Sequence, residues 1–550
     1  MENNGWFKTI LIHTGLAASA VLLFSGSFPN IVFRNGLPLL AWFAYLPVLV
    51  LVKKNNFLAC AGWGAIYGYV SYSLFNYWLA AFHPLAGIIV GCIYLVYMAA
   101  VFTLLKLADV LFPRRSYLVQ WVIWLAYEYL RTRGFLGYSY GITGYSQWHI
   151  TPLIQIASVT GVWGVSALVT FPSFWLAEAL KNWQLREGLK STGASIAAFF
   201  RKEKIPALVW AGALCAVLVF GVTRNRDFSS YPSANIALVQ HNMDPWMATK
   251  APTPYQIGQA YRRDLAVLKR LSDEALASEP KPQMVVWPET AFVPRIYWHI
   301  TYRDDQDSWI IVKELLDYLA SKDVPFLIGN DDGRMEPAKN PNSDEKFRVD
   351  YNAAILFENG NISNVYRKLH LVPFTEHFPY ERQLPFISRA LEKEDTHFWE
   401  KGEKAVVFQG PGFTFSAPIC FEDTFGYLSR NFVLGGADVL VNISNDAWSN
   451  SLPSQYQHLS MAVFRAVENN RPMVRSTVSG QTCAIDPLGR ITGMASPFSE
   501  TWINATVPLA SGKTIYTLYG DYLGAAFSFL ALILLLSGAV CCTIRKIKEG

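Results

Sequence analysis

The stretch Phe415-Ser-Ala-Pro-Ile-Cys420-Phe-Glu422-Asp423 places a thiol at the end of an apolar run and directly before two acidic residues. The run from Phe413 to Ile419 predicts a short buried strand, and the polar segment after Cys420 predicts a turn or the start of a helix. Helix starts and nearby cations lower the pKa of a cysteine thiol and make it a better nucleophile. The stretch therefore predicts a reactive cysteine at a strand end.

Two other strand-like runs also end in residues that can take part in chemistry. The run 283–287 leads into Glu289, and the run 361–366 leads into Lys368. A thiol, a carboxylate and an ammonium group are the nucleophile, the base and the cation that an acyl transfer needs. Alone, each is more often structural, because buried cysteines pack cores and charged residues after strands lie in solvated turns. Their occurrence together in one region favours an active site.

These residue types suggest specific roles. We expect Cys420 to attack an ester or thioester carbonyl and Glu289 to take the thiol proton. The attack creates an oxyanion, which Lys368 and the backbone N–H of Phe421 would stabilise.

Residues 226–510 alternate between strand-like and helix-like patterns, which predicts an α/β layered fold. Asn359-Gly360 predicts a hairpin turn, and the polar residues 331–350 predict a surface loop. Residues 369–403 predict a long irregular segment. Helices are expected at 253–278, 307–320, 423–434 and 455–469, and strands at 234–240, 284–287, 325–329, 351–358, 361–367, 413–419, 437–443, 473–478, 481–486 and 501–507.

The remainder of the chain has the composition of a membrane protein. The whole chain is 52% hydrophobic and only 16% charged, whereas soluble domains are about 25% charged. We expect a helical membrane domain at 1–225 with seven spans, a catalytic domain at 226–510, and a last span with a tail at 511–550. The eight expected spans lie near 8–26, 37–52, 57–80, 86–110, 117–131, 152–180, 206–222 and 521–543.

Basic residues in the loops predict the orientation. Lys53 and Lys54, the basic residues of 181–204, and the basic C-terminal tail all fall on one side if both chain ends are cytoplasmic. The catalytic domain then lies outside the cytoplasm. Arg131 and Arg133 break this pattern. They are either tolerated interfacial residues or cations that face lipid headgroups on the outer side.

Composition also argues against several classes of site. The net charge of +5 is small and follows the membrane loops, so no nucleic-acid partner is expected. Only Cys420 and Cys483 lie in the soluble region. Two cysteines do not make a disulfide framework, and a bridge between them is not favoured. No metal-ligand spacing occurs, and neither a metal nor an organic cofactor is expected.

The motifs that carry these residues resemble a known family. Val286-Trp287-Pro288-Glu289-Thr290, Tyr366-Arg367-Lys368 and Ile419-Cys420-Phe421-Glu422 resemble the Glu-Lys-Cys signature of the nitrilase, or carbon–nitrogen hydrolase, superfamily, whose fold is an αββα sandwich. Further segments narrow the resemblance to the bacterial apolipoprotein N-acyltransferases: Lys368–Pro379, Val441–Trp448, Gln457–Ala462, Arg471–Thr477 and Thr517–Asp521.

The resemblance implies an enzyme of the bacterial inner membrane whose catalytic domain faces the periplasm. It implies that an acyl chain moves from a phospholipid, through a cysteine thioester, to the α-amino group of a diacylglyceryl-cysteine apolipoprotein, and we expect a monomer. It also implies supporting roles near the active site for Glu376, Glu422, Phe421, Asn352 and Trp246.

Some positions depart from the family pattern. Phe421 stands where a tyrosine is expected, Thr375 and His241 stand where glycines are expected, and Ser449-Asn450 replaces an aromatic-glycine pair. None of these departures changes Glu289, Lys368 or Cys420.

Two other functions remain open from the sequence. One is a membrane-tethered nitrilase-type amidase that passes the acyl group to water, and its chemistry is the same up to the thioester. The other is a scaffold without activity, which would not need Glu289, Lys368 and Cys420 together. Transport is disfavoured because Glu128 is the main carboxylate within the predicted spans.

Overall fold

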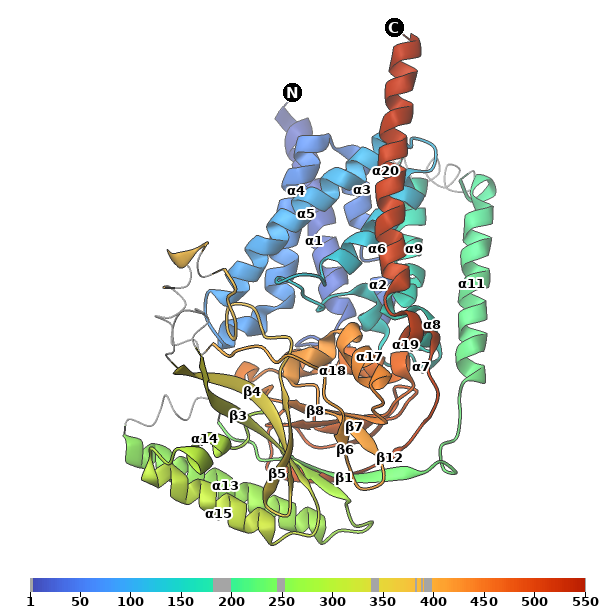
Figure 1. Ribbon diagram of the computed structural model, residues 1–550. Coiled ribbons are helices and arrows are strands. Elements are labelled where there is room, and N and C mark those ends of the chain that lie inside the picture. Colours follow the sequence, from blue (N-terminus) through green and yellow to red (C-terminus); the bar gives the residue numbers. More distant parts are fainter. Residues whose placement is uncertain are drawn as a thin grey trace. The chain divides into compact units, whose positions relative to one another are not determined.

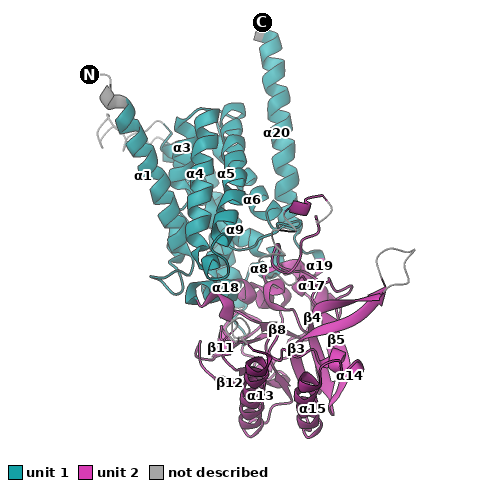
Figure 2. Cartoon of the chain, turned by 90° about the vertical axis from the view of Figure 1, so that its left-hand side faces the viewer, with its two compact units in different colours: residues 1–226, 451–460, 519–550 teal, residues 227–450, 461–518 magenta. Residues whose placement is uncertain are grey.

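The computed structural model describes residues 3–181, 199–244, 253–337, 346–380, 383–386, 389 and 398–549. The chain divides into two compact units (Figure 2). The first consists of residues 1–226, 451–460 and 519–550, and the second of residues 227–450 and 461–518. Helix α18 (Leu452–Asn469) begins in the first unit and ends in the second.

The first unit is helical. Five of its helices are long and apolar enough to cross a membrane within the part of the chain that the structure describes: most of α1, then α5, α9, α11 and most of α20. Other helices and 3-10 turns lie between them. The helices are α1 (Asn3–Ser27), α2 (Pro38–Ala41), α3 (Leu46–Lys54), α4 (Phe57–Phe75), α5 (Ala86–Leu111), α6 (Ser116–Leu130), α7 (Thr151–Ile154), α8 (Ala157–Thr160), α9 (Val162–Ala179), α11 (Lys204–Thr223) and α20 (Tyr522–Glu549).

The expected count of eight spans is therefore not reproduced. The segment 37–52 forms two short helices, and 117–131 forms a helix of only 15 residues. Helix α4 has 19 residues, and it is not among the five. In the segment 152–180, Gly161 with φ 64° separates two short helices from the long α9. Apolar composition alone does not show where a helix is interrupted.

Charged side chains near the ends of several helices lie together in the helical unit. The Lys53 ammonium lies 3.4 Å from Asp109 and 2.5 Å from Glu178, and Lys181 lies 3.6 Å from Glu178. Lys53, Asp109 and Glu178 lie near the C-terminal ends of α3, α5 and α9. The loops that follow these three helices therefore lie together, as the charge pattern predicts. The two chain termini also lie at one end of this unit (Figure 1).

The second unit contains two six-stranded sheets, with the strand orders β12-β1-β2-β3-β4-β5 and β11-β10-β9-β8-β7-β6. Parallel pairs at the centre of each sheet bring strand ends to a common edge. The strands are β1 (Ser233–Gln240), β2 (Met284–Val286), β3 (Phe326–Pro337), β4 (Lys346–Glu358), β5 (Asn361–Arg367), β6 (Phe408–Gln409), β7 (Thr414–Ser416), β8 (Val439–Ser444), β9 (Met473–Thr477), β10 (Cys483–Ile485), β11 (Ile491–Met494) and β12 (Thr501–Pro508).

The sheets face each other, and helices cover their outer sides. The Ser476 hydroxyl of β9 donates to the carbonyls of Val239 and Val286, which lie on β1 and β2 of the other sheet. Helices α13 (Pro254–Leu276) and α15 (Gln306–Ala320) bury Leu268 and Leu315 against the first sheet. Helix α17 (Gly426–Leu434) and the end of α18 lie on the opposite side of the unit from α13 and α15 (Figure 1). This is the αββα sandwich that the resemblance implies.

The prediction of a surface loop over residues 331–350 is wrong at both ends. Strand β3 continues to Pro337 and β4 begins at Lys346, and the two pair without a break from Phe326–Phe357 to Pro337–Lys346. The buried positions of this extension include Asp332, Gly333 and Asp350, which interrupt the apolar pattern of a strand, so its sequence looks like a loop. The sequence patterns also missed α14 (Ile296–Thr301) and the short strands β6 and β11.

Candidate active site

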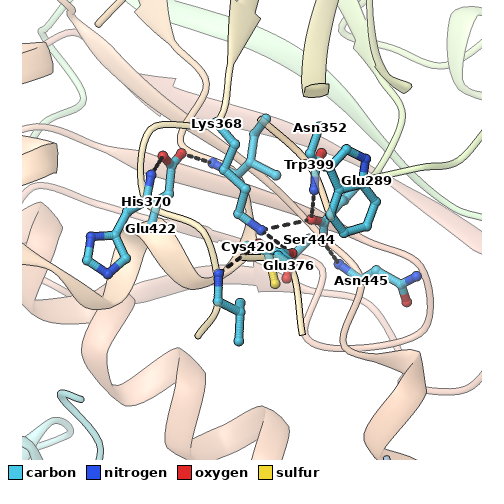
Figure 3. A network of polar contacts seen from close by, with 12 residues as sticks. Glu289, Asn352, Lys368, His370, Glu376, Trp399, Cys420, Glu422, Ser444 and Asn445 are labelled. Atoms are coloured by element: carbon cyan, nitrogen blue, oxygen red, sulfur yellow. Dashed lines mark hydrogen bonds and ion pairs between the residues drawn. The ribbon is translucent and has the colours of Figure 1, made fainter. Parts of the chain in front are cut away.

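The three predicted catalytic residues follow the ends of different strands of both sheets. Glu289 follows β2, Lys368 follows β5 and Cys420 follows β7, and Asn445, which was not predicted, follows β8. Figure 3 shows their side chains in one polar network. The structure thus brings together residues that are 79 and 52 positions apart in the sequence.

Lys368 lies at the centre of this network. Its side chain is fully buried, and its Nζ donates to Glu289 Oε1 at 3.3 Å and to Glu376 Oε1 at 2.8 Å. Burial alone lowers the pKa of Lys368, but the two carboxylates and Cys420 outweigh it and hold that pKa well above its ordinary value. Lys368 is therefore a fixed positive charge at physiological pH.

Cys420 opens a 3-10 turn (Cys420–Thr424) with φ 50°. A side chain in this left-handed region is strained by about 1–3 kcal/mol, and such residues concentrate at functional sites. Burial and the nearby Glu289 raise the pKa of the Cys420 thiol well above its ordinary value, although Lys368 lowers it. The resting group is thus a thiol, so a base must take its proton during the attack.

Glu289 is held in position by donors on both of its oxygens. Asn352 Nδ2 of β4 donates to Oε1 at 2.7 Å, and the backbone N–H of Asn445 donates to Oε2 at 2.9 Å. The side chain of Glu289 is 7% exposed. The carboxylate therefore has a fixed orientation next to the thiol and the ammonium group, as a general base requires.

Glu376 and Glu422 fix the segments on either side of the site. Glu376 Oε2 accepts the N–H of Val372 at 2.9 Å, which closes the turn that carries it. Glu422 Oε1 accepts the N–H groups of Leu369 and His370 at 2.7 and 3.0 Å, directly after Lys368.

The other oxygen of Glu422 binds the segment that leads to the nucleophile. Its Oε2 accepts the N–H of Ile419 at 2.8 Å, and Tyr366 OH lies 2.8 Å from both oxygens. Glu422 thus ties the Cys420 turn to the Lys368 segment. Burial raises the pKa of Glu422 to about 7, although these donors favour its ionised form.

The remaining predicted site residues of the second unit differ in their placement. Asn352 joins the network through Glu289, as described above. The Phe421 ring packs edge-on against Phe425 at 5.0 Å and lies 5.8 Å from the His370 ring, so it contributes an apolar wall. Trp246 lies outside the described residues.

Arg131 and Arg133, the two candidate headgroup contacts, both form side-chain contacts within the first unit. Arg131 is only 4% exposed, and its Nη1 donates to Tyr94 OH at 2.8 Å and to the Tyr140 carbonyl at 2.9 Å. Aromatic and carbonyl groups of the unit surround the guanidinium. The contact of either arginine to a lipid headgroup stays a prediction. The Arg133 side chain is 35% exposed and pairs with Asp521.

Sequence reasoning assigned no role to several residues of the site. Trp399 donates its backbone N–H to the Glu376 carbonyl at 3.0 Å and its Nε1–H to Asp331 at 3.1 Å. Ser444 and Asn445 lie in the Val441–Trp448 segment, where the family resemblance marked a motif without showing which atoms act. Trp399 lies in a segment without periodicity, and nothing in the sequence around it indicated a role.

No group of three His, Cys, Asp or Glu side chains suited to a metal ion occurs among the residues that were placed. The chemistry that the network itself can perform needs only its own groups. It combines a thiol, an oriented carboxylate and a fixed ammonium group, which are the requirements of acyl transfer through a thioester.

Comparisons with known proteins agree with this geometry. The carbon–nitrogen hydrolase family model matches residues 235–516, and the model of the apolipoprotein N-acyltransferase N-terminal domain matches residues 19–175. Apolipoprotein N-acyltransferase 1 of Treponema pallidum is 46% identical over 560 aligned residues, which cover 100% of both chains. Apolipoprotein N-acyltransferase 1 of Treponema denticola is 42% identical and covers 97% of both.

Among solved structures, Saccharomyces cerevisiae Nit3, a member of branch 10 of the nitrilase superfamily, is 18% identical, with a TM-score of 0.35. The match covers 52% of this chain and 92% of that one.

Proposed function

The chain belongs to the apolipoprotein N-acyltransferase family, and we propose that it moves an acyl chain from a phospholipid, through a thioester on Cys420, to the α-amino group of a diacylglyceryl-cysteine apolipoprotein. The acyltransferase activity follows from the family. The donor, the acceptor and the residue roles are the proposal. The observation that carries it is the Lys368 ammonium, buried between the Glu289 and Glu376 carboxylates and coupled electrostatically to the Cys420 thiol.

In the first half of the reaction, Glu289 takes the thiol proton while the Cys420 sulfur attacks an ester carbonyl of the phospholipid. The positive charge of Lys368 and the N–H of Phe421 stabilise the oxyanion. The intermediate collapses when the C–O ester bond breaks, and Glu289 returns the proton to the leaving alkoxide. A lysophospholipid leaves, and the acyl chain remains on the sulfur as a thioester.

In the second half, the α-amine of the acceptor attacks the thioester carbonyl. Glu289 takes a proton from the amine, and the same groups stabilise the second oxyanion. The C–S bond then breaks, the thiolate leaves, and the proton returns to it from Glu289. The products are an amide-linked acyl chain and the free thiol, so the cycle closes without another reactant.

We also propose where the enzyme acts. Five apolar helices support a membrane location, and the clustered basic loops support a cytoplasmic position for that end of the helical unit. The catalytic domain then faces the periplasm of the inner membrane.

Arg133, partly exposed, is the candidate contact to a phospholipid headgroup. Arg133→Ala should therefore raise the apparent KM for phospholipid more than it lowers kcat. The catalytic groups all come from one chain, which supports a monomer.

A transfer assay tests the proposal against the amidase alternative. The purified enzyme in detergent receives a phospholipid with a labelled acyl chain and a diacylglyceryl-cysteine peptide, with its α-amine either free or acetylated. We expect label on the free-amine peptide alone, and no transfer by Cys420→Ser. Label that appears as free fatty acid at the same rate with both peptides would contradict the acyltransferase proposal and support transfer to water.

A further inference from the structure

The last residue of β8 lies at the level of the nucleophile. Ile443 forms an isolated parallel bridge with Ile419, so the next residues, Ser444 and Cys420, lie side by side where their strands end. Ser444 is fully buried, and its hydroxyl lowers the pKa of the adjacent Cys420 thiol. Ser444 is labelled beside Cys420 in Figure 3.

The same hydroxyl has a second acceptor. Ser444 Oγ donates to Asp446 Oδ1 at 3.1 Å, and the sulfur of the adjacent Cys420 offers the same hydrogen a second acceptor. A hydroxyl hydrogen rotates freely about the Cβ–Oγ bond and points to the acceptor that carries more negative charge. Which bond forms therefore depends on the charge of the sulfur.

A buried arginine holds this carboxylate. Arg475 is fully buried on β9, and its guanidinium contacts Asp446 at 3.4 Å and Asp423 on the other side. Asp423 belongs to the 3-10 turn that Cys420 begins. Arg475 thus links the turn after β8 to the turn of the nucleophile. Its positive charge also balances that of Asp446, which weakens the hydrogen bond that Asp446 accepts from Ser444.

We propose that Ser444 is a further catalytic residue whose hydroxyl donates to Asp446 while Cys420 is a thiol or a thioester, and turns to the sulfur whenever Cys420 is a thiolate. This inference rests on the proposed thioester chemistry. The proton itself still moves between Cys420 and Glu289, and no bond to Ser444 forms or breaks. The hydroxyl stabilises the sulfur anion as it forms before the first attack and as it leaves in the second half.

The two electrostatic influences on the thiol have opposite signs. The Ser444 hydrogen bond lowers the pKa of Cys420, and the charge of Asp446 raises it. Removal of the Ser444 hydroxyl should thus raise the pKa of Cys420, and neutralisation of Asp446 should lower it. A purely structural role would not produce such a pair of changes.

The test measures the alkylation of Cys420 by iodoacetamide as a function of pH, without lipid, and quantifies the Cys420 peptide by mass spectrometry. Each pKa unit changes the thiolate fraction about tenfold. Ser444→Ala should move the midpoint up by about one pH unit and slow alkylation about tenfold below it. Ser444→Thr, which keeps the hydroxyl, should restore wild-type behaviour, and Asp446→Asn should move the midpoint down.

Ser476→Ala is the matched control, because Ser476 is a fully buried serine on the neighbouring strand whose hydroxyl binds backbone carbonyls. Its midpoint should equal that of the wild type. The inference is overturned if Ser444→Ala keeps the wild-type midpoint, if Ser476→Ala moves it equally, or if Asp446→Asn moves it up. Because no acyl donor is present, the result separates this inference from the proposed function.

Discussion

At the scale of single residues, the proposed site is centred on a buried lysine with two carboxylate partners. Lys368 is the cation between Glu289 and Glu376, and all three side chains are buried or nearly so. Removing one partner of such a cluster leaves charge uncompensated in a low-dielectric interior, which costs about 3–5 kcal/mol. We propose that the same ammonium group stabilises the resting enzyme and the negative charge of the transition state.

Lys368→Met should therefore abolish acyl-enzyme formation at every phospholipid concentration, because its charge is needed mainly in the transition state. Pre-steady-state acylation over a range of lipid concentrations measures this. Lys313→Met, in an exposed helical ion pair with Asp317, is the control and should acylate normally. A Lys368→Met enzyme that reaches the normal maximal rate and only needs more lipid would show that the lysine binds the headgroup.

Glu422 gives a prediction of pH dependence. Its pKa of about 7 in the folded protein lies above the ordinary value of about 4.3 in an unfolded chain. The folded state thus binds the proton more tightly, and the stability that this provides is present below pH 4 and lost as the pH rises through 7.

The melting temperature of the wild type should consequently fall, relative to that of Glu422→Gln, as the pH rises from 5 to 8. Calorimetry or thermal fluorescence in one detergent over this range measures the difference. Should the wild type instead gain stability over the variant with rising pH, the pKa of Glu422 is lowered and the carboxylate is ionised throughout.

At the scale of elements, a buried ion cluster joins α3, α5 and α9 of the helical unit. The Lys53 side chain is 1% exposed and lies between Asp109 and Glu178, whereas its neighbour Lys54 is exposed. The sequence presents the two lysines as an equivalent basic pair. Only the packing of three helices shows that one of them is a structural cation.

Lys53→Met should thus destabilise the protein by a few kcal/mol, since it leaves two buried carboxylates with fewer cations. Lys54→Met, one position further along, should change stability by less than about 0.5 kcal/mol, as is usual for surface substitutions. Thermal unfolding of both variants in the same detergent compares them. Equal melting temperatures would contradict the role of the cluster.

The elements also show what sequence patterns can and cannot predict. Strands such as β1 and β8 were predictable because buried apolar runs mark them. Glu289, Lys368 and Cys420 became candidates because each follows a strand-like run within a motif that resembles one family, and their roles stay predictions. The extension of β3 and β4 beyond Asp331 was not predictable, since the buried Asp332 and Asp350 interrupt its apolar pattern. Trp399 was missed because its partners, Glu376 and Asp331, are distant in sequence and no local pattern encodes contacts of that range.

At the scale of the whole molecule, the chain combines a helical unit with an αββα sandwich. The family of the chain and the apolar helices agree on a membrane enzyme. The side of the membrane on which the sandwich lies follows from the basic loops alone, and this step needs its own test.

A membrane-impermeant thiol reagent on intact spheroplasts provides that test. Lys281→Cys, at an exposed position of the second unit, should react before lysis. Lys8→Cys, at an exposed position near the N-terminus, should react only after lysis, and the unmodified chain corrects for native cysteines. The reverse pattern would place the sandwich in the cytoplasm.

The central claim is that Cys420 carries the acyl chain, and mass spectrometry of the purified enzyme tests it most directly. After incubation with phospholipid and no acceptor, the Cys420 peptide should gain the mass of one acyl chain, and hydroxylamine should remove it because the bond is a thioester. Addition of a diacylglyceryl-cysteine peptide should also remove it and move the same mass to the peptide. Cys483→Ser should behave like the wild type. An enzyme that transfers the acyl chain at a normal rate with no adduct on Cys420, or with Cys420 replaced by serine, would contradict the account.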